Sequence, residues 1–271
     1  SKPLVPVRLG RFGIVLEPCF QRQSAWLPRR VVWGVVDKWN FVEMTMKSSE
    51  VTELKSDFHR DGFVIIRGFI SPVVLTELQE RAQSAVQCLD SKYKKHGLPQ
   101  IHGNVAKGLE RVDKYFKDWI DDGPHVALVR ALLDETPTPA SVGYFCKEEA
   151  EEEIHPHRDG DNGLTIWFAM DSASPDNGCV HFLRGSHLQF KDDGQLFSLG
   201  KSHDFSAEPN AVAAILDPGD VSIHNSKTIH WSGKNKSGRP RRAINCFYQK
   251  KRVSTLRKPL AQKDFHAQTL A

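Results

Sequence analysis

The spacing of apolar residues changes near Pro139, from a helical period before it to short extended runs after it. Val51, Leu54 and Phe58 recur at helical spacing, and Ser48–Ser49 just before them can cap the start of a helix. The regular part of the chain therefore opens with helices and continues with strands. This order predicts a sheet protein that carries its helices on one side.

Three more elements are predicted before this change. Asp61–Gly62 turns the chain into the apolar run Phe63–Phe69, which is typical of a strand. Ser71–Pro72 starts a long helix, because Pro is favoured at the first helical position. The apolar stripe of that helix consists of Leu75, Leu78, Ala82, Ala85 and Leu89. A further amphipathic helix is expected over His125–Leu133.

The later part of the chain contains eight short runs separated by turn residues, which we expect to be strands. They are Ser141–Cys146, Ile154–Asp159, Leu164–Asp171, Gly178–Leu183, Ala211–Leu216, Asp220–His224, Thr228–Trp231 and Arg242–Gln249. The fold predicted from this pattern is mainly β with flanking helices, a double-stranded β-helix of the jelly-roll or cupin-like kind. We expect one domain, 44–271, behind an N-terminal extension of unclear role, 1–43.

Composition is that of an ordinary soluble globular protein, with 39% hydrophobic and 26% charged residues. No run of eighteen apolar residues occurs, so no membrane span is expected. The five cysteines are scattered without a CxxC motif, which favours a reducing compartment and a cytoplasmic location.

The net charge of +4 is unevenly distributed. Ser232–Lys258 holds ten Lys and Arg and no acid, which favours an anionic small-molecule ligand. Most such runs are solvated faces, and no aromatic residues interleave with a basic groove, so nucleic acid is not the expected partner.

Candidate chemistry gathers at His157 and Asp159. In an extended chain these two side chains point to one side, and they supply two-thirds of the 2-His-1-carboxylate set that holds a non-haem Fe(II). His155 and His157 form a competing pair with the same spacing. The third ligand should come from far along the chain, and His230 is well placed in a late strand.

An arginine close to His230 suggests a co-substrate. Arg241 offers a guanidinium fork that suits a carboxylate, and a 2-oxo acid needs such an anchor beside the metal. Arg242 could replace Arg241 if the strand were shifted by one residue. His224 is expected to be a strand residue whose ring is satisfied by the backbone.

Several short motifs in their order along the chain resemble the phytanoyl-CoA dioxygenase family. They are His157-x-Asp159, Asn177-Gly178-Cys179, Gly185-Ser186-His187, Gly219-Asp220-Val221, Ile229-His230-x-Ser232-Gly233 and Arg241. The resemblance implies that His157, Asp159 and His230 bind iron and that Ser232 and Arg241 bind the 2-oxoglutarate C5 carboxylate. It also implies that Trp167 lines the pocket of this co-substrate.

The expected function is that of an Fe(II)- and 2-oxoglutarate-dependent dioxygenase that uses O2, with ascorbate as a helpful additive. Related halogenases have Gly or Ala in place of the carboxylate ligand, so Asp159 favours hydroxylation of an unactivated C–H bond. The expected substrate is a small anionic metabolite, with 2-aminoethylphosphonate as the specific hypothesis. Arg158, Asp161 and Asn162 are the candidate substrate contacts.

Two alternatives stay open at this point. Within the same reaction class, the substrate could be a branched fatty acyl-CoA whose phosphates meet the basic run. In another class, the chain could be a non-enzymatic jelly-roll module that binds an anion or nucleic acid. That second alternative gives no reason for a His-x-Asp pair, a late His and an Arg to occur together.

Overall fold

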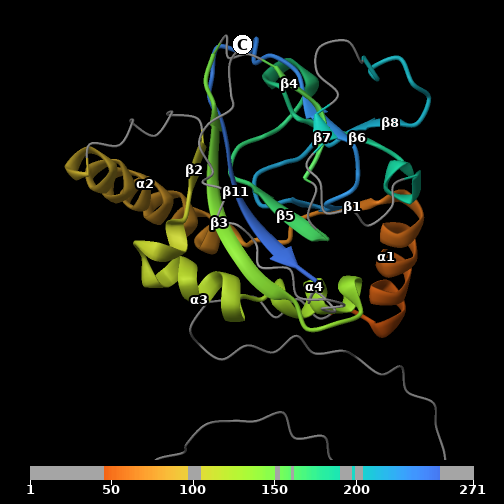
Figure 1. Ribbon diagram of the computed structural model, residues 1–271, viewed down its shortest axis with the longest axis horizontal. Coiled ribbons are helices and arrows are strands. Elements are labelled where there is room, and N and C mark those ends of the chain that lie inside the picture. Colours follow the sequence, from red (N-terminus) through yellow and green to blue (C-terminus); the bar gives the residue numbers. More distant parts are fainter. Residues whose placement is uncertain are drawn as a thin grey trace, which may run out of the picture.

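The structure, a computed structural model, describes residues 46–96, 105–149, 153–159, 162–189, 197–198 and 204–250. The predicted extension 1–43 and the candidate contact Asp161 lie outside the described residues. Two antiparallel sheets form the centre, and the helices pack around the larger sheet (Figure 1). Within the described residues, no helix combines the length and the hydropathy that a membrane span requires.

The first helix, α1, covers Ser48–Asp61 and corrects the predicted cap. Ser48 and Ser49 lie inside the first turn, and Lys47 occupies the cap position. Glu50 supports this start, because its carboxylate accepts a hydrogen bond of 2.7 Å from the Lys47 backbone nitrogen.

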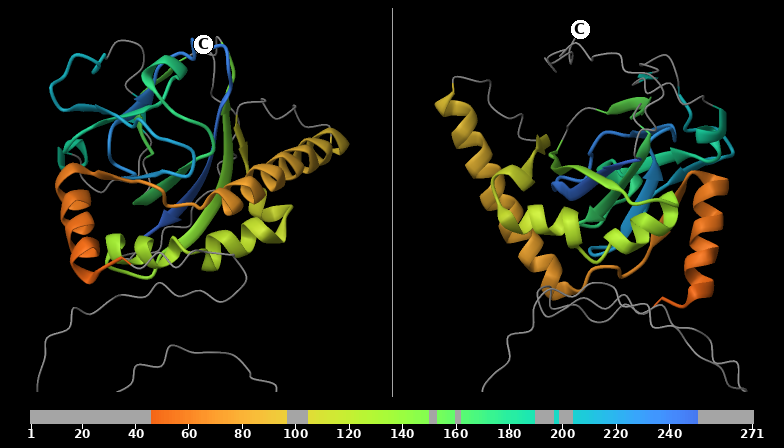
Figure 2. Two further views of the ribbon diagram at one scale, coloured as in Figure 1. Left: turned by 180° about the vertical axis from the view of Figure 1, so that it is seen from behind. Right: turned by 60° about the horizontal axis from the view of Figure 1, so that its bottom comes forward.

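The second helix, α2, begins as predicted. It covers Pro72–Lys95, and Ser71 caps it by accepting a hydrogen bond from the backbone nitrogen of Val74. The remaining helices are α3 (Lys114–Asp122), α4 (Val126–Leu133) and the short 3-10 turns η1 (Leu109–Arg111), η2 (Pro175–Asn177) and η3 (Ser186–Gln189). Helices α3 and α4 run along one side of the larger sheet, with α2 and α1 at its two ends (Figure 2).

The larger sheet has six strands in the order β1-β9-β5-β11-β3-β2. Their bounds are β1 Phe63–Ile66, β9 Val221–Asn225, β5 Gly163–Ala169, β11 Arg241–Gln249, β3 Thr138–Lys147 and β2 Val105–Lys107. All neighbouring strands are antiparallel. The sheet therefore combines the early strand β1 with strands from the second half of the chain, which is consistent with the predicted jelly roll.

The smaller sheet has five strands in the order β7-β4-β10-β6-β8. Their bounds are β7 Phe197–Ser198, β4 Ile154–Arg158, β10 His230–Ser232, β6 Val180–Leu183 and β8 Ala211–Ala213. All eight predicted strands are confirmed, although β8 ends three residues before the predicted Leu216. The short strands β2 and β7 were not predicted.

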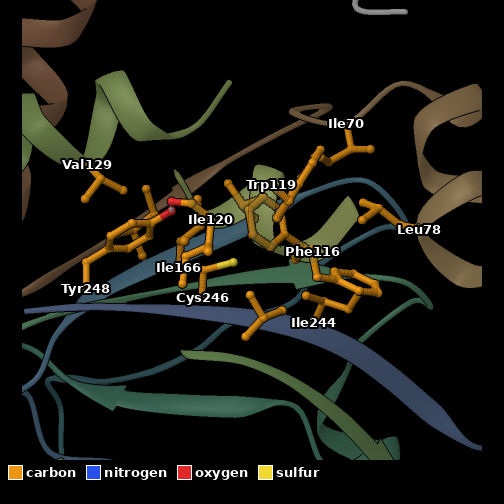
Figure 3. Packing of buried hydrophobic residues seen from close by; sticks show 14 of the residues in the cluster. Ile70, Leu78, Phe116, Trp119, Ile120, Val129, Ile166, Ile244, Cys246 and Tyr248 are labelled. Carbon is orange, nitrogen blue, oxygen red and sulfur yellow. Dashed lines mark hydrogen bonds between the residues drawn. The ribbon is translucent and has the colours of Figure 1, made fainter. Parts of the chain in front are cut away.

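The main hydrophobic core lies between the helices and the outer face of the larger sheet. Figure 3 shows Leu78, Phe116 and Trp119 from the helices packed over Ile244 and Cys246 of β11. A smaller cluster fills the space between the two sheets and includes the stacked aromatic pair Phe63 and Phe182. Because side chains alternate along a strand, the residues between those of the main core face the space between the sheets.

Candidate active site

Three of the predicted residues converge between the sheets. His157 lies in β4, Asp159 directly follows the end of that strand, and His230 starts β10. Each offers one ligand atom, and these atoms lie within 4.8 Å of one another. His157 and His230 are direct partners in the β4–β10 pairing, with ring centroids 4.2 Å apart. Sheet pairing, and not sequence proximity, brings the late histidine to the other two.

Backbone carbonyls fix the orientation of both rings. His157 Nδ1 lies 2.8 Å from the His155 carbonyl, and His230 Nδ1 lies 2.9 Å from the Thr228 carbonyl. A carbonyl only accepts, so Nδ1 carries the proton in each ring and Nε2 keeps its lone pair for a metal. His155 itself is not in the cluster, because its ring lies near Glu153 at 3.6 Å.

The charge state of the cluster suits a divalent metal. Burial lowers the pKa of His157 to about 4 and also lowers the pKa of His230. Burial alone would raise the pKa of Asp159, but His230, His224 and His157 outweigh it and hold that pKa below its usual value. Near neutral pH the cluster therefore consists of two neutral imidazoles and one carboxylate, the donor set of a mononuclear non-haem Fe(II) site.

Two buried cationic groups lie near Ser232, which is two residues beyond His230 on β10. Arg241 begins β11 with 4% of its surface exposed, and its guanidinium carbon is 5.1 Å from the centroid of the Trp167 ring. Lys147 is its cross-strand partner on β3, also with 4% exposure. The Lys147 ammonium donates to Ser232 Oγ at 2.9 Å and to the Gly233 carbonyl at 2.6 Å. Two buried cations and a hydroxyl so close together can bind a carboxylate.

The two candidate arginines of β11 have different surroundings. Arg242 reaches the opposite face of the sheet, where it makes two hydrogen bonds of 2.7 Å to the Asp171 carboxylate. The alternative anchor, Arg242, is therefore already paired with an acid outside the space between the sheets.

The sequence did not predict a role for Lys147, although a lysine directly after the apolar run Ser141–Cys146 was a usable signal.

Two of the three candidate substrate contacts, Arg158 and Asn162, lie in the described part of the chain. Arg158 is buried, but it follows His157 in β4, and successive side chains of a strand leave on opposite faces. The backbone carbonyl of Asn162 accepts a hydrogen bond of 2.8 Å from the Lys250 backbone nitrogen. Contact of Arg158 and Asn162 with a substrate stays a prediction.

Two residues that the sequence reasoning did not assign to the site do face Asp159. His224 Nε2 lies 3.6 Å from Asp159 Oδ2, and Thr165 Oγ1 lies 3.4 Å from the same oxygen. The His224 ring centroid is 4.6 Å from that of His230. The expectation that the backbone satisfies His224 is wrong, because neither of its ring nitrogens has a hydrogen-bond partner among the described residues.

A row of residues crosses the inner face of the larger sheet beside the cluster. Lys107, Gly143, Asn245 and Trp167 are consecutive cross-strand partners on β2, β3, β11 and β5. The Asn245 amide lies over Gly143, since a Cβ at that glycine would be 2.5 Å from Asn245 Oδ1. Burial is the main cause of the low pKa of His157, and the charge of Lys107 contributes to it. The row therefore offers an amide and an ammonium group on the metal side of the sheet.

Comparison with known proteins identifies relatives of this chain. The family model for phytanoyl-CoA dioxygenase matches residues 58–243, more than half of the chain. The peroxisomal phytanoyl-CoA dioxygenase of Bos taurus is 27% identical over 136 residues, 46% of this chain and 40% of that protein. This chain thus spans about two fifths of the length of that curated relative. The multifunctional dioxygenase prhA of Penicillium brasilianum is 23% identical over 223 residues, 72% of this chain and 70% of that protein.

Solved structures share the fold. The epimerase SnoN in complex with Fe3+, alpha ketoglutarate and nogalamycin RO superposes with a TM-score of 0.60 at 19% identity, over 74% of this chain and 84% of that one. EctD from S. alaskensis with 2-oxoglutarate and 5-hydroxyectoine gives a TM-score of 0.59 at 18% identity, over 73% and 75% of the two chains. With the family model matching most of the described domain, this chain belongs to the phytanoyl-CoA dioxygenase family.

Proposed function

We propose that this protein is an Fe(II)- and 2-oxoglutarate-dependent dioxygenase that hydroxylates an unactivated C–H bond of a small anionic metabolite. The observation that carries the proposal is the cluster of two neutral imidazoles and a carboxylate beside two buried cations. His157, Asp159 and His230 would hold the iron. When bound, the iron and 2-oxoglutarate supply the activation of O2 for the oxidation, with succinate and CO2 as co-products.

The residues of this chain bind and orient the reactants. Arg241 and Ser232 receive the C5 carboxylate of 2-oxoglutarate, and Lys147, which holds the Ser232 hydroxyl, adds a second positive charge. The Trp167 indole under the Arg241 guanidinium limits the access of water to this ion pair. Such exclusion of water strengthens the electrostatic contacts that hold the co-substrate in place.

Asp159 supports hydroxylation as the outcome. Its carboxylate fills a position of the metal cluster that related halogenases leave to a halide, so no halide position is available beside both histidines. The non-enzymatic alternative lacks support, because a simple anion-binding module has no use for two imidazoles turned toward a carboxylate. The basic run that suggested this alternative lies partly outside the described residues.

The substrate class rests on the row across the larger sheet. Lys107 and Asn245 lie in this row on the metal side of the sheet, with Gly143 of β3 between them. A carboxylate or phosphonate oxygen suits such a pair, and 2-aminoethylphosphonate, oxidised at C1, is the specific substrate we propose. A branched fatty acyl-CoA is the second candidate, supported by the name of the bovine relative.

A turnover assay tests the proposal. Purified protein with Fe(II), ascorbate, O2 and 2-oxoglutarate is expected to form succinate, and a panel with 2-aminoethylphosphonate, branched acyl-CoAs and small carboxylates should identify the substrate by increased consumption of 2-oxoglutarate. The His157→Ala variant is the matched inactive control. Absence of succinate with every compound, together with no Fe(II) binding by the wild type, would contradict the proposal.

A further inference from the structure

The two carboxylate oxygens of Asp159 face different neighbours. Oδ1 is turned toward the metal cluster, where it lies 3.8 Å from His230 Nε2. Oδ2 is turned toward the larger sheet, where His224 Nε2 is 3.6 Å away and Thr165 Oγ1 is 3.4 Å away. One oxygen is therefore available to a metal, and the other is available to hydrogen-bond donors.

The sheet fixes the position of both donors. His224 and Thr165 are cross-strand partners of β9 and β5, and their side chains leave the inner face together. The His224 ring is buried at 4% exposure and packs against Phe182, with ring centroids 5.1 Å apart. The packing between the two sheets therefore holds the His224 ring beside Asp159.

A buried imidazole without a partner is unusual. Buried polar groups in proteins are nearly always hydrogen-bonded, and both nitrogens of His224 lack a partner among the described residues. Asp159 Oδ2 is the acceptor that faces Nε2, and 3.6 Å is only slightly longer than a hydrogen bond. A small rotation of the carboxylate closes this separation, as catalytic hydrogen bonds often do when a site is loaded.

We infer that His224, assisted by Thr165, is a positioning residue for Asp159 and not a ligand. It donates from Nε2 to Oδ2 and holds the carboxylate so that only Oδ1 meets the iron. This inference rests on the proposed function. In the proposed site, the two imidazoles and a chelating 2-oxo acid would fill four positions of the iron, so a carboxylate bound through one oxygen would leave a position for O2. Binding through both oxygens would occupy the position that O2 needs.

The arrangement also argues against His224 as a further metal ligand. His224 is not part of the cluster of ligand atoms formed by the other three residues. Its Nε2 faces Oδ2, the oxygen of Asp159 that is turned away from His230. A hydrogen bond to the outer oxygen of a ligating carboxylate typically changes metal affinity and activity without replacing the ligand.

Three variants test this role. His224→Phe keeps a flat ring against Phe182 and removes the donor, whereas His224→Gln places an amide donor near the Nε2 position. Thr165→Val keeps the shape of Thr165 and removes its hydroxyl. His181→Phe is the matched control, because His181 lies on β6 with its ring stacked on Trp231, outside the cluster.

The measurements are anaerobic Fe(II) titration of the apoprotein, the charge-transfer absorption of the Fe(II)–2-oxoglutarate complex and the melting temperature of the apoprotein. We expect His224→Phe to weaken Fe(II) binding by about 10–100-fold and to change the absorption band, with the melting temperature retained. His224→Gln should restore most of the affinity, Thr165→Val should show a smaller loss, and His181→Phe should match the wild type.

Two results would overturn the inference. Unchanged Fe(II) affinity and absorption in His224→Phe would show that the ring has no role toward Asp159. Complete loss of Fe(II) binding in both His224→Phe and His224→Gln, as in His157→Ala, would make His224 a ligand. If His224→Phe does not fold, His224→Asn replaces it, because the shorter amide of asparagine does not reach Asp159 Oδ2. An Fe(II) affinity of His224→Asn equal to that of His224→Gln would then overturn the inference. Failure of the proposed function is recognised separately, since the wild type itself would bind no Fe(II).

Discussion

Arg241 and Arg242 are neighbours in the chain, yet they reach opposite faces of the larger sheet. Arg241 points into the space between the sheets, where its guanidinium lies over the Trp167 ring. Arg242 points to the helix side and is bound through two hydrogen bonds to Asp171. The alternation of side chains along β11 therefore separates the arginine that we propose for the co-substrate from the arginine that is paired with Asp171.

Replacing Arg241 by alanine should weaken 2-oxoglutarate binding. Loss of a charge-assisted contact costs about 1.5–3 kcal/mol, which corresponds to roughly a 10–100-fold higher dissociation constant. Titration of the Fe(II)-loaded protein with 2-oxoglutarate measures this change. Arg242→Ala is the matched control and should leave 2-oxoglutarate binding intact, with a loss of unfolding free energy below about 1 kcal/mol because the pair is partly exposed. The reverse pattern would move the anchor to Arg242.

Replacing His157 or Asp159 by alanine should abolish metal binding and turnover. Each change removes one of three converging ligands, and the two that remain do not form a facial set. Metal content after reconstitution with Fe(II) and succinate formation are the measurements. His155→Ala is the control, because His155 contributes to the site through its backbone carbonyl. Retention of one equivalent of iron by His157→Ala would contradict the assignment of the cluster.

Much of the fold could be predicted because its signals are local. The Ser71–Pro72 start of α2 and its apolar stripe depend on residues within one helix, and the stripe is buried as expected. The strands with strong apolar runs and flanking turns were also confirmed. In contrast, β2 and β7 contain three and two residues, too few to establish a period.

The parts of the site that were missed depend on contacts between distant strands. His224 meets Asp159 only because β9 pairs with β5 and the smaller sheet lies over both. Lys147 approaches Ser232 across 85 positions of sequence. No spacing along one segment contains this information. The proposed iron ligands could be named from the sequence because the His-x-Asp pair is itself a local signal, and the family motif supplied the distant His230.

The glycine beside Asn245 should determine how the substrate is held. A methyl group at Gly143 would lie 2.5 Å from Asn245 Oδ1, so Gly143→Ala should displace the amide from its place over that glycine, between β11 and Lys107 of β2. With 2-aminoethylphosphonate as substrate, we expect Gly143→Ala and Lys107→Met each to raise KM by about tenfold, since a charge-assisted contact is lost or misplaced, while kcat changes less. A rise in the 2-oxoglutarate requirement alone would instead connect Lys107 with the co-substrate.

Acid should destabilise the fold through His125, a histidine remote from the candidate metal ligands. Its ring is fully buried, packs against Trp119 and Phe168, and lies 2.6 Å from the Tyr248 hydroxyl. That hydroxyl donates to the Ile120 carbonyl, so its oxygen accepts the proton on His125 Nε2. The core thus holds the neutral ring, and burial lowers the pKa of His125 to about 3.

The sign of the pH dependence follows from that lowered pKa. The unfolded chain protonates this histidine below about pH 6.5, whereas the folded chain does not until about pH 3. The contribution of His125 to the free energy of unfolding is therefore fully present above the unfolded pKa. It falls with pH below that value, by about 2 kcal/mol between pH 7.5 and pH 5.

His125→Gln keeps a donor for Tyr248 but cannot be protonated. The free energy of unfolding of this variant, measured with urea, should therefore fall by about 2 kcal/mol less than that of the wild type over this range. His96→Gln, at the exposed end of α2, should keep the wild-type dependence. Equal losses in His125→Gln and the wild type would mean that the buried ring accepts a proton without unfolding.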